Sequence, residues 1–212
     1  MNGERMPSIS LMSRLWPFLL VLCVLAFVTF PTLEGIVTRW LKWDESYSHG
    51  LLLAGVSLYL IWRKAKANPV APGFAPVWVL SLIACLLAYW VGGLIRLQAL
   101  QQLALVPLLF AACATLMGWR QARWFIVPLG LLFLTIPVWD FLAWTLQVIT
   151  VSVNKFLLGF FDIDFEVEGV FVYLIGVGTF EVAHGCSGLR YLLVGQALVL
   201  IYGELYLSRL RS

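Results

Sequence analysis

The sequence predicts an all-α polytopic membrane protein that also carries a small extracytoplasmic β-hairpin. Three observations predict this fold class. The chain is 62% hydrophobic and only 12% charged over 212 residues, which leaves too little polar surface to cover a water-soluble globule. Its apolar residues gather in runs close to the length that crosses a bilayer. One segment near the C-terminal end instead alternates β-branched and aromatic residues, as strands do.

The apolar runs are the candidate transmembrane helices, because about 20 apolar residues cross about 30 Å of hydrocarbon at 1.5 Å per residue. The first run follows Arg5 and Arg14 and lacks a small-residue cleavage site, so we expect an uncleaved span that Pro31 kinks or ends. The runs are Trp16–Val37, Leu51–Trp62, Val77–Ile95, Leu97–Met117, Trp124–Trp139, Phe141–Phe161 and Leu189–Leu207.

Short basic linkers orient these runs. The linker from 63 to 76 (RKAKANPVAPGFAP), the turn from 118 to 123 (GWRQAR) and the N-terminal segment all carry Lys or Arg. Cytoplasmic loops are enriched in these residues. The pattern therefore predicts that the N-terminus and alternate linkers are cytoplasmic, and that the fifth run ends on the outer side.

The run Phe141–Phe161 interrupts this alternation. If it crossed the membrane, the basic residues after the last run would face outward, against the positive-inside rule. Polar residues at helical spacing also mark one side of this segment: Gln147, Thr150, Asn154 and Lys155. Such a stripe suits a helix in the interface or beside a polar cavity. We therefore expect about six transmembrane helices plus one interfacial or half-embedded helix.

The segment 162–184 is the predicted hairpin. Alternating large residues lie between Val167 and Val182, around Gly176 and Gly178. Exposed sheet edges do not occur in lipid. The segment is therefore expected to form an extracytoplasmic cap within a single domain that covers residues 1–212.

Composition argues against several classes of function. A net charge of +3, with basic residues only in short clusters, does not favour nucleic-acid binding. Three cysteines, Cys23, Cys85 and Cys113, lie inside apolar runs, and the spacing shows no disulfide framework or zinc site. With only two histidines, a structural metal is not expected, and no cofactor is implied.

The segment 181–193, EVAHGCSGLRYLL, gathers chemically versatile side chains directly before an apolar run. Cys186 would lie at the N-terminus of the last helix, where the helix dipole favours a thiolate. Arg190, one turn further on, would also favour the thiolate or polarise a carbonyl oxygen. His184 is a candidate general base, because histidine is the usual base beside a nucleophilic thiol.

A structural interpretation of the same residues stays open. The Cys-Ser-Gly stretch also fits a packing patch of small residues, with Ser187 as a helix N-cap and Arg190 reaching towards the interface. A second polar patch, DESYSHG (44–50), is predicted on the same outer side. It is either an interfacial loop with an aromatic anchor or another wall of one site, which His49 would then line.

The sequence resembles the exosortase/archaeosortase family at DESYSHGLLLAGVSLYLIWRK and at EVAHGCSGLRYLL, with QQLAL and GWRQAR also similar. The resemblance implies a thiol protease or transpeptidase of the bacterial inner membrane, with its active site facing the periplasm. Its partners would be secreted proteins with a C-terminal sorting signal of the PEP-CTERM type: a short motif, a transmembrane helix and a basic tail. The family is associated with exopolysaccharide production. Cys186 corresponds to the family's nucleophile.

The sequence departs from the family pattern in one respect. The family's catalytic set also includes an arginine in an Asn-x-x-Arg pattern on a later helix, with a histidine or second arginine beyond it. This chain ends at Ser212 before such a helix, and neither Arg190 nor His184 matches those positions. We therefore expect a C-terminally truncated member, and the chain as printed can lack activity.

Two other classes of function remain alternatives. The first is a non-catalytic membrane subunit of an export or polysaccharide-assembly system, whose polar outer patches would bind a partner. The second is a transporter, which needs a polar path at the bilayer midplane. The runs offer little for such a path beyond the polar stripe Gln147–Asn154.

Overall fold

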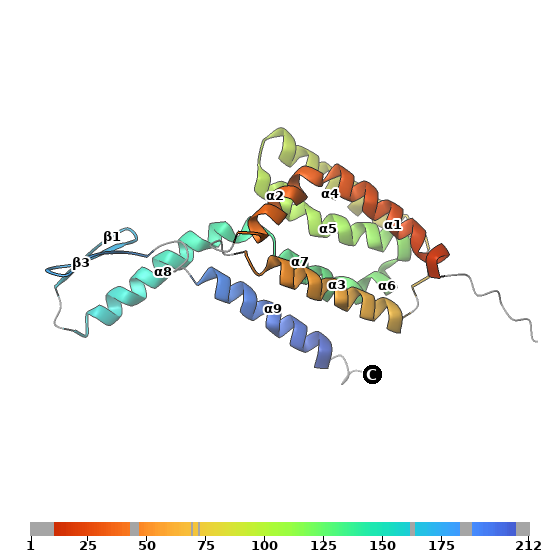
Figure 1. Ribbon diagram of the computed structural model, residues 1–212. Coiled ribbons are helices and arrows are strands. Elements are labelled where there is room, and N and C mark those ends of the chain that lie inside the picture. Colours follow the sequence, from red (N-terminus) through yellow and green to blue (C-terminus); the bar gives the residue numbers. More distant parts are fainter. Residues whose placement is uncertain are drawn as a thin grey trace, which may run out of the picture.

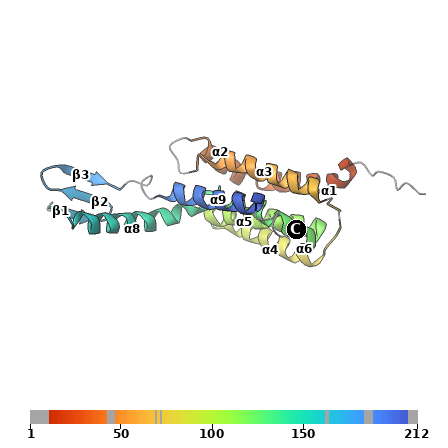
Figure 2. The same ribbon diagram turned by 90° about the horizontal axis from the view of Figure 1, so that it is seen from below.

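The computed structural model describes residues 11–42, 47–68, 70–71, 73–161, 164–182 and 188–206. Most of its helices run along one long axis as a bundle (Figures 1 and 2). The helices are α1 (Leu11–Val28), α2 (Phe30–Trp40), α3 (Gly50–Ala67), α4 (Val77–Leu94), α5 (Gln98–Met117), α6 (Trp119–Ala122), η1 (Arg123–Phe125), α7 (Ile126–Phe133), η2 (Pro137–Trp139), α8 (Asp140–Leu158) and α9 (Leu189–Tyr206). The strands are β1 (Phe165–Glu168), β2 (Phe171–Leu174) and β3 (Gly178–Glu181).

Three helices of the described chain are long and apolar enough to cross a membrane. They are α4, α5 and the segment Pro137–Leu158, which consists of η2 and α8. The helices α1 and α2 are together long and apolar enough, but they are bent by 81° relative to each other. They add a fourth candidate if the pair is one broken span. The expected total of about six spans is therefore not confirmed. The half-embedded placement of Phe141–Phe161 gains no support from length or composition, since α8 belongs to one of the three candidates.

One further expected span differs from the helices that form. Trp124–Trp139 is not one helix: α7 has only eight residues, and a turn follows at Leu134–Ile136 before η2 begins at Pro137. Proline has no N–H to continue the helical ladder, which explains the break. The predicted kink in the first run does occur, because α1 ends at Val28 and Pro31 lies in the first turn of α2.

The bundle has two chemically different ends. One end, which we call the basic end, carries five basic side chains: Arg63, Lys64, Lys66, Arg120 and Arg123. The other end, which we call the site end, contains the α2–α3 corner, the residues that join α7 to α8, and the start of α9 (Figure 1). Contacts at each end link segments that are distant in sequence, for example the Lys64 ammonium to the Trp124 carbonyl at 2.6 Å.

Helix α8 leaves the bundle and carries the sheet (Figures 1 and 2). The structure describes three antiparallel strands in the order β1-β2-β3, where the sequence predicted a two-stranded hairpin. The two connections are tight turns in which Gly169 and Gly176 adopt positive φ values of 60° and 82°, a conformation that glycine adopts without strain. The sheet packs along α8 rather than over the ends of the other helices.

Two residues of the polar stripe on α8, Gln147 and Asn154, face this sheet. Gln147 is buried, and its side-chain amide donates to the Val182 carbonyl at 2.9 Å, just after β3. Asn154 lines a cleft between α8 and the sheet. One member of the predicted polar stripe, Gln147, therefore fastens the end of β3 to α8, whereas the Thr150 hydroxyl donates to the Leu146 carbonyl of its own helix.

Candidate active site at the site end of the bundle

Two polar segments that lie about 140 residues apart share one core cluster. Tyr47, from the DESYSHG patch, is 1% exposed and belongs to the same cluster as Leu189 and Leu193 of α9. Ala143 of α8 completes the cluster at this end, and Trp40 and Trp139 pack against it. The hydrophobic effect that closes this core therefore also brings the α2–α3 corner to the start of the last helix.

The α2–α3 corner is fixed by Trp40. Its indole N–H donates to the Thr135 carbonyl at 2.9 Å, and its ring lies directly against Gly50, the first residue of α3. A Cβ atom at position 50 would overlap the indole ring. Glycine is therefore needed here for the close approach of α3 to α2.

An ion pair joins the corner to α8. The Arg39 guanidinium contacts the Asp140 carboxylate at 2.6 Å, and the two side chains are 37% and 40% exposed. Arg39 lies in the last turn of α2 and Asp140 in the first turn of α8. Each charge complements the dipole of its own helix, so the pair forms where both termini favour it.

Tyr47 and His49 form the wall of the corner that faces the core. Their rings stack with centroids 6.4 Å apart. Burial raises the pKa of the Tyr47 hydroxyl above its ordinary value, and the negative charge of Asp140 raises it further. Tyr47 is therefore a neutral hydroxyl at any physiological pH, and it can serve as a donor but not as a base.

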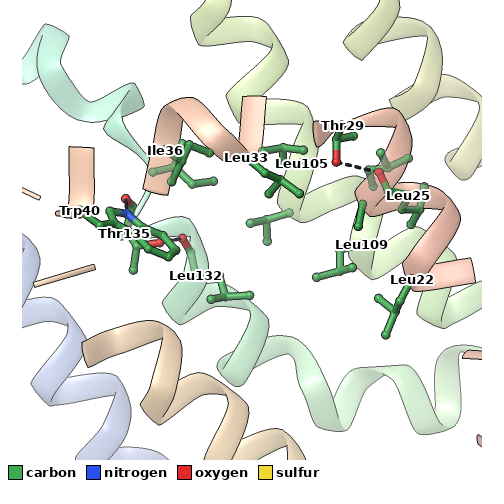
Figure 3. A pocket seen from close by; sticks show the side chains of 14 residues that line it. Leu22, Leu25, Thr29, Leu33, Ile36, Trp40, Leu105, Leu109, Leu132 and Thr135 are labelled. Carbon is green, nitrogen blue, oxygen red and sulfur yellow. Dashed lines mark hydrogen bonds between the residues drawn. The ribbon is translucent and has the colours of Figure 1, made fainter. Parts of the chain in front are cut away.

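An apolar cavity of about 310 Å³ lies behind this corner (Figure 3). Side chains of α1, α2, α5 and the α7 region line it, together with the bend residue Thr29, and Thr29 and Thr135 contribute hydroxyl groups to the lining. Figure 3 also shows the hydroxyl of Thr29 donating to the Leu25 carbonyl at 2.8 Å, at the bend between α1 and α2.

The predicted site residues fall into two groups. Arg190 lies in the first turn of α9, is half-buried and takes part in interactions, and His49 is half-buried at the start of α3. The other three, His184, Cys186 and Ser187, lie outside the described residues. The structure thus places His49 and Arg190 on the two segments that meet in one core. Within the described chain, no group of His, Cys, Asp and Glu could hold a metal ion.

Sequence reasoning missed Arg39 and Asp140, although a signal was present. Both are charged residues at the ends of apolar runs in a chain that is only 12% charged. Ionisable groups at such positions are costly unless they are paired. A search for opposite charges at the same end of the predicted bundle would have found this pair.

The fold defines a polytopic helical membrane protein, and the candidate site lies at one end of its bundle. Residues 40–212 match the model of the transmembrane exosortase family. The chain belongs to that family. No curated protein and no solved structure matches it.

Proposed function

We propose that this protein is a membrane-embedded cysteine transpeptidase or protease that processes secreted proteins at a C-terminal sorting signal. One observation carries the proposal: a transmembrane exosortase chain packs Tyr47, from the second polar patch, and Leu189, at the start of α9, into one core at the same end of the bundle. Sorting of proteins associated with exopolysaccharide is the process we assign to it.

Cys186 is the proposed nucleophile. Its thiolate attacks the peptide carbonyl carbon of the substrate, and the carbon–sulfur bond forms as the carbonyl electrons move to oxygen. The tetrahedral intermediate collapses, the carbon–nitrogen bond breaks, and the leaving amine takes up a proton from water. An acyl-thioester remains, which water or an amine attacks to release the product and the thiol.

Arg190 is proposed to stabilise the negative charge of these steps. It lies in the first turn of α9, at the positive end of the helix dipole, which favours a thiolate or an oxyanion nearby. Peptide geometry limits the Cα atoms of Cys186 and Leu189 to about 10 Å apart, so the thiol can reach this region. His184, Ser187 and His49 are the proposed residues lining the site.

The proposed location is the bacterial inner membrane, with the site end facing the periplasm. The support comes from charge: the basic end carries Arg63, Lys64 and Lys66 of α3 together with Arg120 and Arg123. Loops rich in Lys and Arg stay in the cytoplasm. The opposite end then meets secreted proteins whose C-terminal helix is still in the bilayer.

The test is mass spectrometry for an acyl adduct on Cys186 in the full-length protein. The protein is co-expressed with a secreted protein that carries a sorting motif, a transmembrane helix and a basic tail. We expect the adduct in the unaltered protein and in Cys23→Ala, and its absence in Cys186→Ala. Cys23 is the matched control because it is an exposed thiol on α1.

A second measurement separates the enzyme from a non-catalytic subunit. A membrane-impermeant alkylating reagent added from outside should label Cys186 faster than an ordinary free thiol, because a lowered thiol pKa raises the thiolate fraction. No adduct together with slow alkylation would contradict the proposal and favour the subunit of an export or polysaccharide-assembly system.

A further inference from the structure

Among the described strands, β3 lies at one edge of the sheet. The strand order is β1-β2-β3, so β3 pairs only with β2 among the described strands. All four residues of β3 are exposed. Natural proteins protect edge strands with proline, lysine, a bulge or a covering element, and β3 (GTFE) contains neither proline nor lysine.

The register shows which backbone groups of β3 point outward. Val172 pairs with Phe180 and Tyr173 pairs with Thr179, and the Val182 N–H donates to the Val170 carbonyl at 2.9 Å. Hydrogen-bonded pairs alternate along an antiparallel ladder. The N–H and C=O groups of Phe180 therefore point to β2, whereas those of Thr179 and Glu181 point away from the sheet.

An apolar cleft of about 290 Å³ lies beside this edge, between α8 and the sheet. Its sheet side is lined by Val172 and Leu174 of β2 together with Phe180 and Val182. Side chains of a strand alternate between faces, so a strand added to β3 would direct every second side chain towards this cleft.

The direction of β3 connects the edge to the proposed site. The strand runs back along α8 towards the start of α9 (Figures 1 and 2), and the Gln147 amide holds the Val182 carbonyl at its C-terminal end. A peptide laid along β3 therefore extends towards the site end of the bundle.

We propose that β3 binds an extended segment of the secreted protein as an additional edge strand. Outward backbone groups of Thr179 and Glu181 form the ladder, which supplies affinity independent of sequence, and the cleft selects apolar side chains at alternate positions. The partner is thus an unfolded peptide segment with apolar residues two apart. This inference rests on the proposed function, because it names how that enzyme holds its substrate.

Site-specific cross-linking tests the edge. A photo-cross-linking phenylalanine analogue replaces Thr179 in a Cys186→Ala background, in which the substrate binds without being processed. The matched control is Val167 on β1. The Ile175 N–H donates to the Asp164 carbonyl, so by the same alternation Val167 presents its backbone groups on the opposite edge. We expect a substrate cross-link from position 179 and none from position 167.

Proline substitution provides a second measurement in the active protein. Thr179→Pro removes an outward N–H and leaves the β2–β3 ladder intact, and Val167→Pro does the same on the other edge. Loss of one net hydrogen bond should lower kcat/KM for the processed substrate roughly two- to tenfold in Thr179→Pro. The kcat/KM of Val167→Pro should equal that of the unaltered protein.

The outcomes separate this inference from the proposed function. An adduct on Cys186 with no cross-link from position 179, or with equal cross-links from both edges, contradicts the proposed edge-strand binding and still supports the proposed enzymatic function. A cross-link between two copies of this chain also contradicts the edge-strand binding. A substrate cross-link from position 179 without any adduct supports the edge and contradicts the proposed catalysis.

Discussion

Two ion pairs of equal length provide a direct test of how burial sets the energy of a charge in this protein. The Lys64–Glu204 pair and the Arg39–Asp140 pair both have a contact distance of 2.6 Å. The first pair is 23% and 11% exposed, the second 37% and 40%. We compare Glu204→Gln with Asp140→Asn, which remove one negative charge each and keep the side-chain shape.

Glu204→Gln should be the more damaging change, because it leaves the half-buried Lys64 ammonium without its counter-charge. Breaking a fully buried pair costs about 3–5 kcal/mol, and we expect about 2–3 here since Lys64 keeps its bond to the Trp124 carbonyl. Exposed pairs contribute about 0–1 kcal/mol, which applies to Asp140→Asn. For a protein of this size 1 kcal/mol shifts Tm by about 2–4 °C.

The assay is thermal unfolding in detergent micelles, followed by far-UV circular dichroism at low and high salt. We expect Tm to fall by roughly 4–12 °C in Glu204→Gln and by less than about 4 °C in Asp140→Asn. High salt should erase the Asp140→Asn effect only, because exposed charges are screened. Lys64→Met combined with Glu204→Leu should recover most of the loss. Equal Tm shifts for the two single variants would refute the reasoning.

Two further predictions concern the α2–α3 corner. Gly50→Ala should destabilise the fold by about 1–3 kcal/mol, because the new methyl group meets the Trp40 ring, whereas Gly55→Ala on the open face of α3 should be neutral or stabilising; thermal unfolding of both variants checks this. Tyr47 has a raised pKa, so its contribution is complete below the ordinary tyrosine pKa of about 10 and falls by about 1.4 kcal/mol per unit above it. Tyr47→Phe should remove that slope from denaturant titrations between pH 10 and 11, and a slope identical to that of the control Tyr59→Phe would contradict the assignment.

The sequence predicted the elements whose signal is local. The runs Val77–Ile95 and Leu97–Met117 form α4 and α5 with boundaries within a residue, because an apolar run of spanning length leaves helix as the main option in a membrane. The helix α5 continues through Pro107 in its interior. The strand pattern after residue 162 was also detected. A third strand was missed because the alternation of β1 with glutamates resembles a solvated linker.

The candidate site was predictable only as two separate polar patches. That they meet depends on Tyr47 and Leu189 entering one core, which no local pattern encodes. Likewise, the polar stripe on α8 was visible in the sequence. The hydrogen bond from Gln147 to the Val182 carbonyl could not be predicted, because it depends on where β3 lies. The periodicity of a sequence shows which face of a helix is polar. Which segment packs against that face depends on the tertiary structure.

The contacts of the site end also set when the site can form. Arg39 reaches across 101 residues to Asp140, and the Trp40 indole reaches across 95 residues to Thr135. Contacts of such sequence separation carry the loop-closure entropy of the intervening chain, and contacts of this kind slow folding. We therefore expect the α2–α3 corner to gain its geometry only when α7 and the start of α8 pack against it. An isolated peptide that contains either polar segment lacks this scaffold, so its chemistry is no guide to that of the assembled bundle.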